Sequence, residues 1–314
     1  MWMWLALACI SEPPPSTGPA LIDEVHELVD TRYALFVDKQ VDWEAARQPA
    51  LDALNEGADL QDTVVEMLDV LRDGHVNLAT PGGVSTASAF LEERVPTWDE
   101  DLVQRHVLDF DFAQRGSVQW SIPDPSWAYL RVDDFSNLPT RETLDLAFAE
   151  FAEADRLILD LRANGGGRLE QARTLLERFV EGPLVGWHLE FSTGPGHEDL
   201  SEPAPRELSP VTPGFEGPLA VLVDGRTYSA ANVVAFVLAE RADTMLVGAT
   251  TGGGAGSPTW HELSNGWELR FPTIRLTGPD RQPMEDGRAV DVMIAPDPGQ
   301  PEVDVMIEAA LDVL

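Results

Sequence analysis

Apolar residues in the first quarter of the chain recur at helical spacing. They return every three to four positions within 21–29 and again within 64–71, as expected for helices that bury one face. Asn, Gly and Asp residues within 55–59 indicate a turn between them. We therefore predict a small N-terminal helical domain over 21–78, which closes with the glycine turn at 73–75 and a short alternating strand.

Short apolar runs alternate with amphipathic stretches farther along the chain. They follow residues 79–126, which proline and glycine interrupt and which we interpret as a connecting segment. Strands are predicted at 128–132, 156–161, 185–191, 219–223, 244–247 and 267–276, and helices at 144–151, from 167 to about 179, from 229 to 238 and at 303–314, with a proline-rich excursion at 203–213 and a mobile loop at 250–256. This alternation predicts an α/β domain over 127–314.

The start of the chain is a candidate export signal. An apolar run from Trp2 to Ala8 is followed by Cys9 and then by a polar, proline-rich stretch. This order resembles a bacterial lipoprotein signal, which is cleaved before a cysteine that is then acylated. An ordinary signal segment is the alternative, because no Lys or Arg precedes the run. We predict a leader and tether over 1–20 and a periplasmic or cell-surface protein, which meets the membrane only through a lipid anchor at Cys9.

Composition excludes several classes of partner and site. The chain has 54 acidic and 21 basic residues and a formal net charge of −33, so its surface repels phosphate groups and we expect neither nucleic acid nor an anionic membrane as a partner. Cys9 is the single cysteine, which excludes an intramolecular disulfide. No pair of His or Cys residues has the spacing of metal ligands, so we expect no metal, and we expect no cofactor.

Ser229 occupies a position where a serine can act chemically. The apolar strand at 219–223 ends at a turn, and a largely apolar helix begins directly after Ser229. A hydroxyl there faces free backbone N–H groups and the positive end of the helix dipole, which would stabilise an oxyanion beside it. Serine is also a favoured helix N-cap, and capping is the alternative interpretation of this position.

A glycine-rich loop at 162–167 follows the predicted strand 156–161. Its backbone can turn sharply and expose several N–H groups to an anion. It lacks the Lys-Ser/Thr of a phosphate loop and the Gly-x-Gly-x-x-Gly spacing of a dinucleotide site, which argues against nucleotide binding. An oxyanion hole for acyl transfer fits better, and a plain tight turn is the alternative.

A serine hydroxyl is a weak nucleophile near neutral pH and needs a base, usually lysine or histidine. The only lysine is Lys39, in the N-terminal helices, and we expect it to be out of reach of Ser229. Of the six histidines, only His75 lies in a tight turn at a domain junction, where active-site side chains are often displayed. Glu285, in the acidic motif 284–287, is a candidate to orient it.

Four motifs occur together and in order: Asp-Gly-His at 73–75, Asp-Leu-Arg-Ala-Asn-Gly-Gly-Gly at 160–167, Thr-Tyr-Ser-Ala-Ala at 227–231 and Gly-Ala-Thr-Thr-Gly-Gly at 248–253. The set resembles the C-terminal processing (tail-specific) peptidase family, which includes the tricorn core protease and the modules of interphotoreceptor retinoid-binding protein. The resemblance spans about 21–314. It implies an α/β catalytic core of ββα units in a spiral, related to the ClpP and crotonase folds, with an N-terminal helical region.

The resemblance also implies roles for individual residues. It implies that Ser229 is the nucleophile, and that the loop around Gly165 and Gly166 forms an oxyanion hole with the amide of Ala230. The loop at 250–256 holds no lysine, whereas lysine-using members of the family have one there.

The chain is therefore similar to the tricorn type, whose base is the histidine that matches His75. That type places a serine before the histidine, where this chain has Gly74, and a glutamate near the C-terminus, for which Glu285 is the nearest match. The segment 79–126 is too short for the PDZ domain that many members carry.

These observations predict an exported serine peptidase that acts on a peptide or protein. Two alternatives share the same residues. A non-catalytic protein of this fold would bind an apolar ligand or a peptide in its cleft, and Gly74 in place of the serine favours it. A crotonase-like enzyme would act on thioesters and would need no nucleophilic serine.

Overall fold

The computed structural model of the protein describes residues 18–86, 94, 96–108, 112–137, 141–295 and 302–314. Of the leader and tether predicted over 1–20, residues 1–17, with Cys9, lie outside the described residues and stay a prediction, whereas residues 18–20 are the first residues of helix α1. In the described part of the chain, no helix is both long enough and apolar enough to cross a membrane.

Helices and strands are interleaved along the chain. In order they are α1 (Gly18–Arg32), α2 (Arg47–Asn55), α3 (Leu60–Asp69), β1 (Asn77–Thr80), β2 (Gly83–Thr86), α4 (Glu100–Val103), β3 (Ala113–Arg115), β4 (Val118–Asp124), β5 (Trp127–Val132), α5 (Arg141–Glu150), β6 (Arg156–Asp160), α6 (Leu169–Leu176), β7 (Leu184–Phe191), β8 (Ala204–Leu208), β9 (Leu219–Val223), α7 (Ala230–Leu238), β10 (Thr244–Gly248), β11 (Gly256–Glu262), β12 (Glu268–Thr277), β13 (Val292–Met293) and α8 (Val305–Val313). The mixed α/β fold class predicted from the sequence is confirmed.

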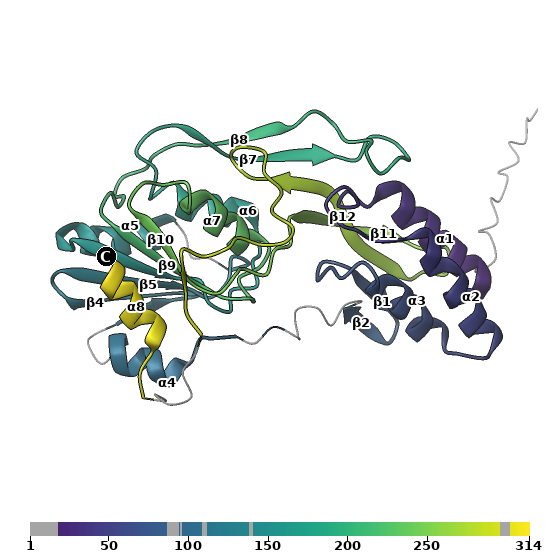
Figure 1. Cartoon of the computed structure of the whole chain (residues 1–314), viewed down its shortest axis with the longest axis horizontal. Coiled ribbons are helices and arrows are strands. Elements are labelled where there is room, and N and C mark those ends of the chain that lie inside the picture. The colour runs from purple at the N-terminus through teal and green to yellow at the C-terminus, as the bar shows by residue number, and fades with distance from the viewer. Residues whose placement is uncertain (1–17, 87–93, 95, 109–111, 138–140, 296–301) are drawn as a thin grey trace, which may run out of the picture.

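A seven-stranded sheet forms the larger part of the molecule, in the order β13-β10-β9-β6-β5-β4-β3 (Figure 1). Strands β5, β6, β9, β10 and β13 run parallel, and β4 and β3 add antiparallel edges. Alternate residues of the central strands pack on α5, α6 and α7 on one face and on α8 and α4 on the other. This two-sided burial explains why these strands are continuous apolar runs.

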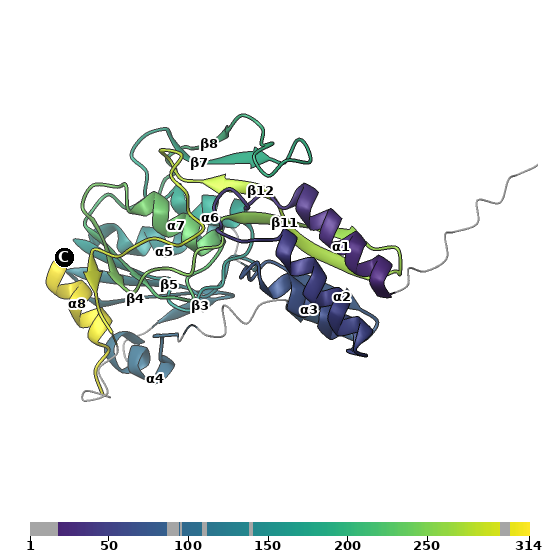
Figure 2. The ribbon, with the colours of Figure 1, turned by 45° about the vertical axis from the view of Figure 1, so that its right-hand side comes forward.

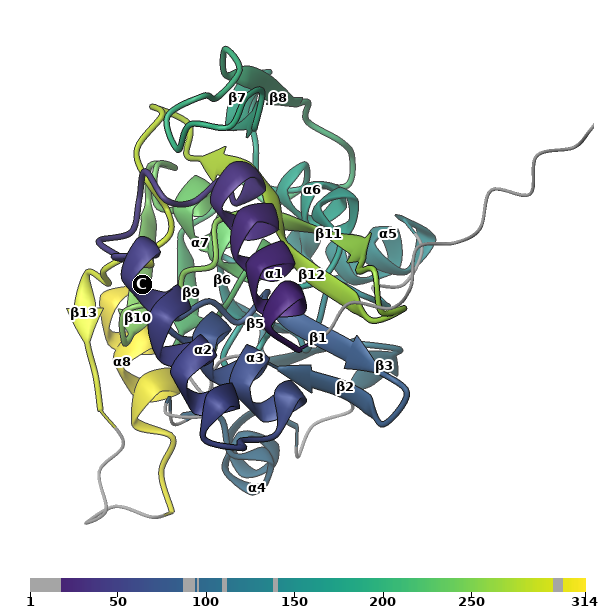
Figure 3. The same ribbon diagram turned by 90° about the vertical axis from the view of Figure 1, so that its right-hand side faces the viewer.

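A six-stranded antiparallel sheet forms the second part, in the order β2-β1-β12-β7-β8 with β11 also on β12. Helices α1, α2 and α3 lie against it (Figures 2 and 3). Their apolar faces share one core with Leu263, Leu269 and Phe271. The segment predicted as a helical domain at 21–78 is therefore packed on strands from the C-terminal third of the chain.

The sequence located most elements within a few residues and missed three strands. β8 lies inside the proline-rich excursion at 203–213, β11 follows the loop at 250–256, and β13 has two residues. The predicted connecting segment contains β3 and β4, and β4 pairs with β5 across the predicted boundary at 126. The loops after β6 and β9 leave the carboxyl ends of parallel strands, where clefts in open α/β sheets usually form.

Candidate active site

Ser229 lies in a strained turn between β9 and α7. Its backbone has φ 54° and ψ −121°, a combination that costs a non-glycine residue roughly 1–3 kcal/mol. Its N–H donates to the carbonyl of Gly253 at 2.9 Å, which helps to hold this conformation. The side chain makes no helix-capping hydrogen bond, so the capping interpretation does not apply. In a strand-turn-helix of this kind, the hydroxyl is exposed to a substrate and is not occupied by a hydrogen bond to the helix backbone.

His75 is within hydrogen-bond distance of that hydroxyl. Its Nε2 lies 2.9 Å from Oγ of Ser229, although the two residues are 154 positions apart in the sequence. The residue is 5% exposed and lies between α3 and β1. Strand β1, which begins just after His75, pairs with β12. This pairing places the histidine next to the loops at the end of the seven-stranded sheet. The structure thus brings together the two residues on which the sequence prediction depended.

Asp73 is the carboxylate that faces the other side of the histidine ring. Its Oδ1 accepts the backbone N–H of His75 at 2.8 Å and the hydroxyl of Tyr228 at 3.0 Å, and its Oδ2 accepts the hydroxyl of Tyr33 at 2.8 Å. Burial alone would raise the pKa of Asp73. The hydrogen bond and charge of His75, with the charge of Lys39, outweigh burial and hold this pKa below its usual range, so Asp73 is a carboxylate at neutral pH.

Tyr228 links this carboxylate to the ring. Its hydroxyl oxygen lies 3.2 Å from Nδ1 of His75, and Nδ1 lies 3.3 Å from Oδ1 of Asp73. Nε2 can accept the hydroxyl of Ser229 only in the tautomer whose proton is on Nδ1, and both oxygens can accept that proton. Burial and then the charge of Asp73 raise the pKa of Tyr228 well above its ordinary value, so it remains a donor.

Glu285 lies behind this group and does not contact His75. Its Oε1 forms an ion pair with Nζ of Lys39 at 2.6 Å, and its Oε2 accepts the N–H of Ala255 at 2.7 Å. Burial and the charge of Asp73 raise the pKa of Glu285 to about 7, and the opposing effect of Lys39 is smaller. Any support that Glu285 gives to the histidine is therefore indirect, and the carboxylate next to the ring is Asp73.

The raised pKa of Glu285 predicts a pH-dependent contribution to stability. An acid whose pKa is higher in the folded than in the unfolded chain stabilises the fold fully below its unfolded value of 4.5, and this contribution is lost as pH rises through about 7. We therefore expect the unfolding free energy of the wild type to fall relative to that of Glu285→Gln between about pH 5 and about pH 8 in urea titrations.

The exposed Glu262 provides a matched control, since Glu262→Gln removes one carboxylate without touching a buried ion pair. The prediction would be contradicted if the unfolding free energy of the wild type rose relative to that of Glu285→Gln over this pH range. The attraction between Lys39 and Glu285 would then dominate.

The glycine loop lies directly against the serine turn. A Cβ on Gly166, which has φ 95°, would lie 2.6 Å from Cβ of Ser229 and 2.8 Å from the nitrogen of Ala230, so only glycine permits this approach. The N–H of Gly166 donates to Oδ1 of Asn164 at 2.9 Å. The N–H groups of Gly165 and Ala230 have no acceptor among the described residues, and both residues line the cleft.

Of the three residues predicted to form an oxyanion hole, two therefore present free amides and Gly166 supplies the close approach. Free N–H groups beside a nucleophile can stabilise the negative oxygen of a tetrahedral intermediate.

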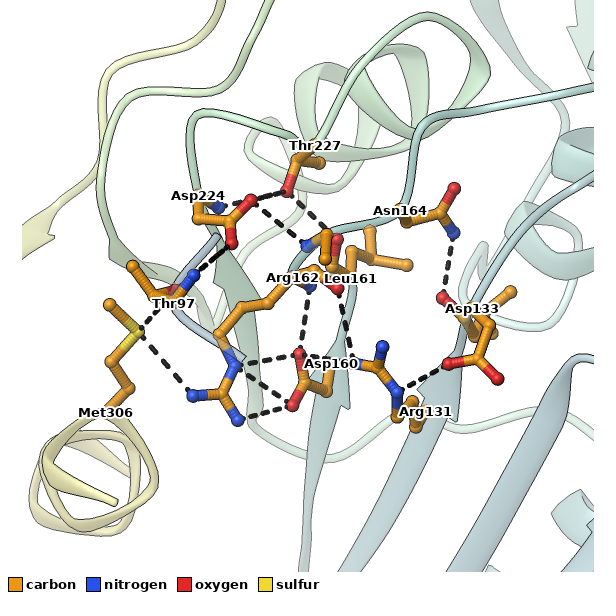
Figure 4. A network of polar contacts seen from close by, with 12 residues as sticks. Thr97, Arg131, Asp133, Asp160, Leu161, Arg162, Asn164, Asp224, Thr227 and Met306 are labelled. Atoms are coloured by element: carbon orange, nitrogen blue, oxygen red, sulfur yellow. Dashed lines mark hydrogen bonds and ion pairs between the residues drawn. The ribbon is translucent and has the colours of Figure 1, made fainter. Parts of the chain in front are cut away.

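Buried polar groups fix the ends of β6 and β9 under these loops (Figure 4). Arg162 donates to both oxygens of Asp160, and it forms a 2.9 Å ion pair with Asp304 at the start of α8. Asp224, at the end of β9, accepts the N–H of Ala163 at 3.1 Å from the glycine loop. Because Asp160, Arg162 and Asp304 are ion-paired and Asp224 accepts several hydrogen bonds, the network holds the two loops in one register.

A cleft of about 660 Å³ opens above Ser229, with His75, Gly165 and Ala230 in its wall. Its size suits a few residues of an extended peptide. Within the described residues, no group of three or more His, Cys, Asp or Glu side chains is arranged to hold a metal ion.

Sequence reasoning missed four residues of this site. Asp73 and Tyr228 are direct or near neighbours of His75 and Ser229 in the quoted motifs, and this adjacency was the available signal. Tyr33 and Lys39 carry no local signal. Lys39 was considered only as a base for Ser229, whereas its ammonium group pairs with Glu285.

Known proteins resemble this chain in sequence and in structure. Residues 126–297 match the family model of peptidase family S41. The chain is 29% identical over 162 residues to the carboxy-terminal processing protease CtpA of Bacillus subtilis, an alignment that covers 51% of this chain and 32% of that protein. It is 27% identical over 194 residues to a carboxyl-terminal-processing protease of Picosynechococcus, covering 59% of this chain and 44% of the relative.

The chain thus spans less than half the length of these curated relatives. Among solved structures, a protein of Parabacteroides merdae described as a candidate peptidase superposes with a TM-score of 0.85 and 28% identity, covering 95% of this chain and 96% of its own.

Proposed function

The chain belongs to peptidase family S41, and on this premise we propose that it is a serine peptidase in which Ser229 attacks the peptide carbonyl and His75 transfers the proton. One observation carries the proposal: Oγ of Ser229, held in a strained turn, lies 2.9 Å from Nε2 of a buried histidine. A serine with a capping or packing role has no need of this geometry.

The proposed first step is acylation. As Oγ of Ser229 bonds to the substrate carbonyl, Nε2 of His75 takes the hydroxyl proton. The imidazolium is stabilised by Asp73, directly and through the hydroxyl of Tyr228. The carbonyl oxygen, now negative, accepts the free N–H groups of Gly165 and Ala230. Nε2 then gives its proton to the leaving amine, and the acyl-enzyme remains.

The second step reverses these roles with water as the nucleophile. His75 takes a proton from water, the hydroxide attacks the acyl carbonyl, and the proton returns to Oγ of Ser229 as the acid leaves. The tricorn type has a serine before the histidine, where this chain has Gly74 and no side chain. Tyr228 supports the proposal because it provides a hydroxyl at Nδ1 of His75.

Labelling by a fluorophosphonate probe tests the proposal. An activated serine reacts covalently with such a probe, and peptide mapping should locate the modification at Ser229. A purified protein that is folded and takes up no label would instead support the alternative of a non-catalytic binding protein, or of a thioester enzyme that needs no serine nucleophile.

Export and a lipid anchor at Cys9 are supported only by the leader pattern, and we propose them on that ground. Incorporation of labelled fatty acid into the wild type and its loss in Cys9→Ser is the expected result. A wild type that takes up no fatty acid would contradict the anchor.

A further inference from the structure

Two arginine side chains line the cleft around Ser229, and neither has a carboxylate partner among the described residues. They are Arg168, at the start of α6, and Arg270, on β12. Arg162 and Arg275, by contrast, are ion-paired: Arg162 with Asp160 and Asp304, and Arg275 with two carboxylates. Arg241 is also half-buried without a carboxylate partner in the described part of the chain, but its Nε, Nη1 and Nη2 all donate to backbone carbonyls. Arg270 differs from all three, because it lines the cleft and only its Nη1 has an acceptor among the described residues.

Arg270 is held firmly beside the histidine. Its strand position lies between Asn77 of β1 and Trp260 of β11. Its Nη1 donates to Oδ1 of Asn77 at 3.3 Å and reaches the carbonyl of His75 at 3.5 Å, so both acceptors are uncharged. Its Nε and Nη2 have no acceptor in the described part of the chain.

Burial makes this arrangement costly. Loss of solvent lowers the pKa of the Arg270 guanidinium, and the nearby charge of Asp73 offsets this only in part. A half-buried cation without an ion pair is stabilised by any anion that enters its site. The free edge of a guanidinium matches the geometry of a carboxylate, with which it forms two parallel hydrogen bonds.

Arg168, just before α6 on the side of the seven-stranded sheet, adds a second positive charge to the cleft. It directly follows the glycine loop, its backbone N–H donates to the carbonyl of Phe135 at 3.0 Å, and its side chain is exposed. Among the described lining residues the only carboxylate is Asp134, whose Oδ1 accepts the N–H groups of Ser136 and Asn137. The cleft thus has a local excess of positive charge in a protein of net charge −33.

We propose that this cleft binds a carboxylate of the substrate peptide close to the scissile bond, with Arg270 as the main anchor and Arg168 as the second. The proposal rests on the proposed peptidase function and names the substrate class. An Asp or Glu side chain and a free C-terminus offer the same chemistry. Because the whole surface repels anions at a distance, the preferred peptide carries one carboxylate at this point and neutral or basic residues elsewhere.

Two matched pairs of peptides distinguish the sources. One pair differs by Glu or Gln at a single position near the cleavage point, and the other by a free or an amidated C-terminus. For one of these pairs, we expect the wild type to cleave the carboxylate peptide with a kcat/KM about tenfold or more above that of its neutral partner. Arg270→Gln should remove most of this preference through KM, Arg168→Gln should reduce it, and Arg270→Lys should retain part of it.

Arg206→Gln is the control, since Arg206 is an exposed arginine on β8 outside the cleft. It should leave the preference unchanged. Binding of the same fluorescent peptides to Ser229→Ala by polarisation measures carboxylate recognition without catalysis.

The two levels of the proposal fail separately. If the wild type reacts with the fluorophosphonate probe but shows equal kcat/KM and equal binding within both pairs, carboxylate recognition is overturned and the serine hydrolase stands. If no label is incorporated but Ser229→Ala still binds carboxylate peptides in preference, and Arg270→Gln in that background abolishes the preference, the recognition stands and the peptidase assignment is lost.

Discussion

Replacing Ser229 with alanine is expected to reduce kcat/KM for peptide hydrolysis by about 10⁴–10⁶-fold, because every covalent step passes through its oxygen. Alanine removes only that oxygen, and the strained backbone is held by bonds that do not involve the side chain. The variant should therefore fold like the wild type. Steady-state kinetics with a quenched fluorescent peptide, together with thermal unfolding, measure both effects.

Ser257→Ala is the matched control, because Ser257 is a half-buried serine that lines the same cleft. It should change kcat/KM by less than about threefold, as expected for a residue outside the reacting group. A Ser229→Ala variant that retains more than about one hundredth of the activity would contradict the assignment of the nucleophile.

Replacing Asp73 with asparagine is expected to lower kcat by about 10²–10⁴-fold. The buried carboxylate accepts three hydrogen bonds and faces Nδ1 of His75 at 3.3 Å. An amide has no negative charge to stabilise the imidazolium, and its NH₂ group can favour the tautomer in which Nε2 carries the proton. That tautomer cannot accept the hydroxyl proton of Ser229. KM should change little, because Asp73 does not line the cleft.

Glu285→Gln is the informative companion, since the sequence pointed to Glu285 and the structure points to Asp73. We expect Glu285→Gln to lower kcat by less than about tenfold, because its carboxylate acts on the histidine only from a distance through Lys39 and Asp73. The reverse order of effects, with Asp73→Asn nearly wild type and Glu285→Gln inactive, would show that the orienting carboxylate is Glu285.

The candidate site joins parts of the chain that fold into different sheets. His75 and Asp73 come from the segment between α3 and β1, whereas Ser229 and Tyr228 come from the turn after β9. The turn segment that follows α1 adds Tyr33 and Lys39, which reach Asp73 and Glu285. A substitution that loosens α1 to α3 from the six-stranded sheet would therefore disturb the histidine before it disturbs the serine turn.

The sequence by itself determined the parts of this protein that depend on local pattern. The buried strands β6 and β9 appear as apolar runs, and the turns after them appear as a glycine loop and as Ser229 before an apolar helix. The choice of His75 among the histidines as the candidate base followed from the tight turn in which it lies. The resemblance of four short motifs to one family supplied the roles of the individual residues.

Only the tertiary structure decided which groups surround the histidine. The bond between Tyr33 and Asp73 spans 40 residues and that between Tyr228 and Asp73 spans 155, so no periodicity within a window of sequence can register them. In a chain with 54 acidic residues, a carboxylate is distinguished by its burial and by the donors that meet it, and both arise when the two sheets come together. The partner of Lys39 and the two unpaired arginines of the cleft were hidden from the sequence for the same reason.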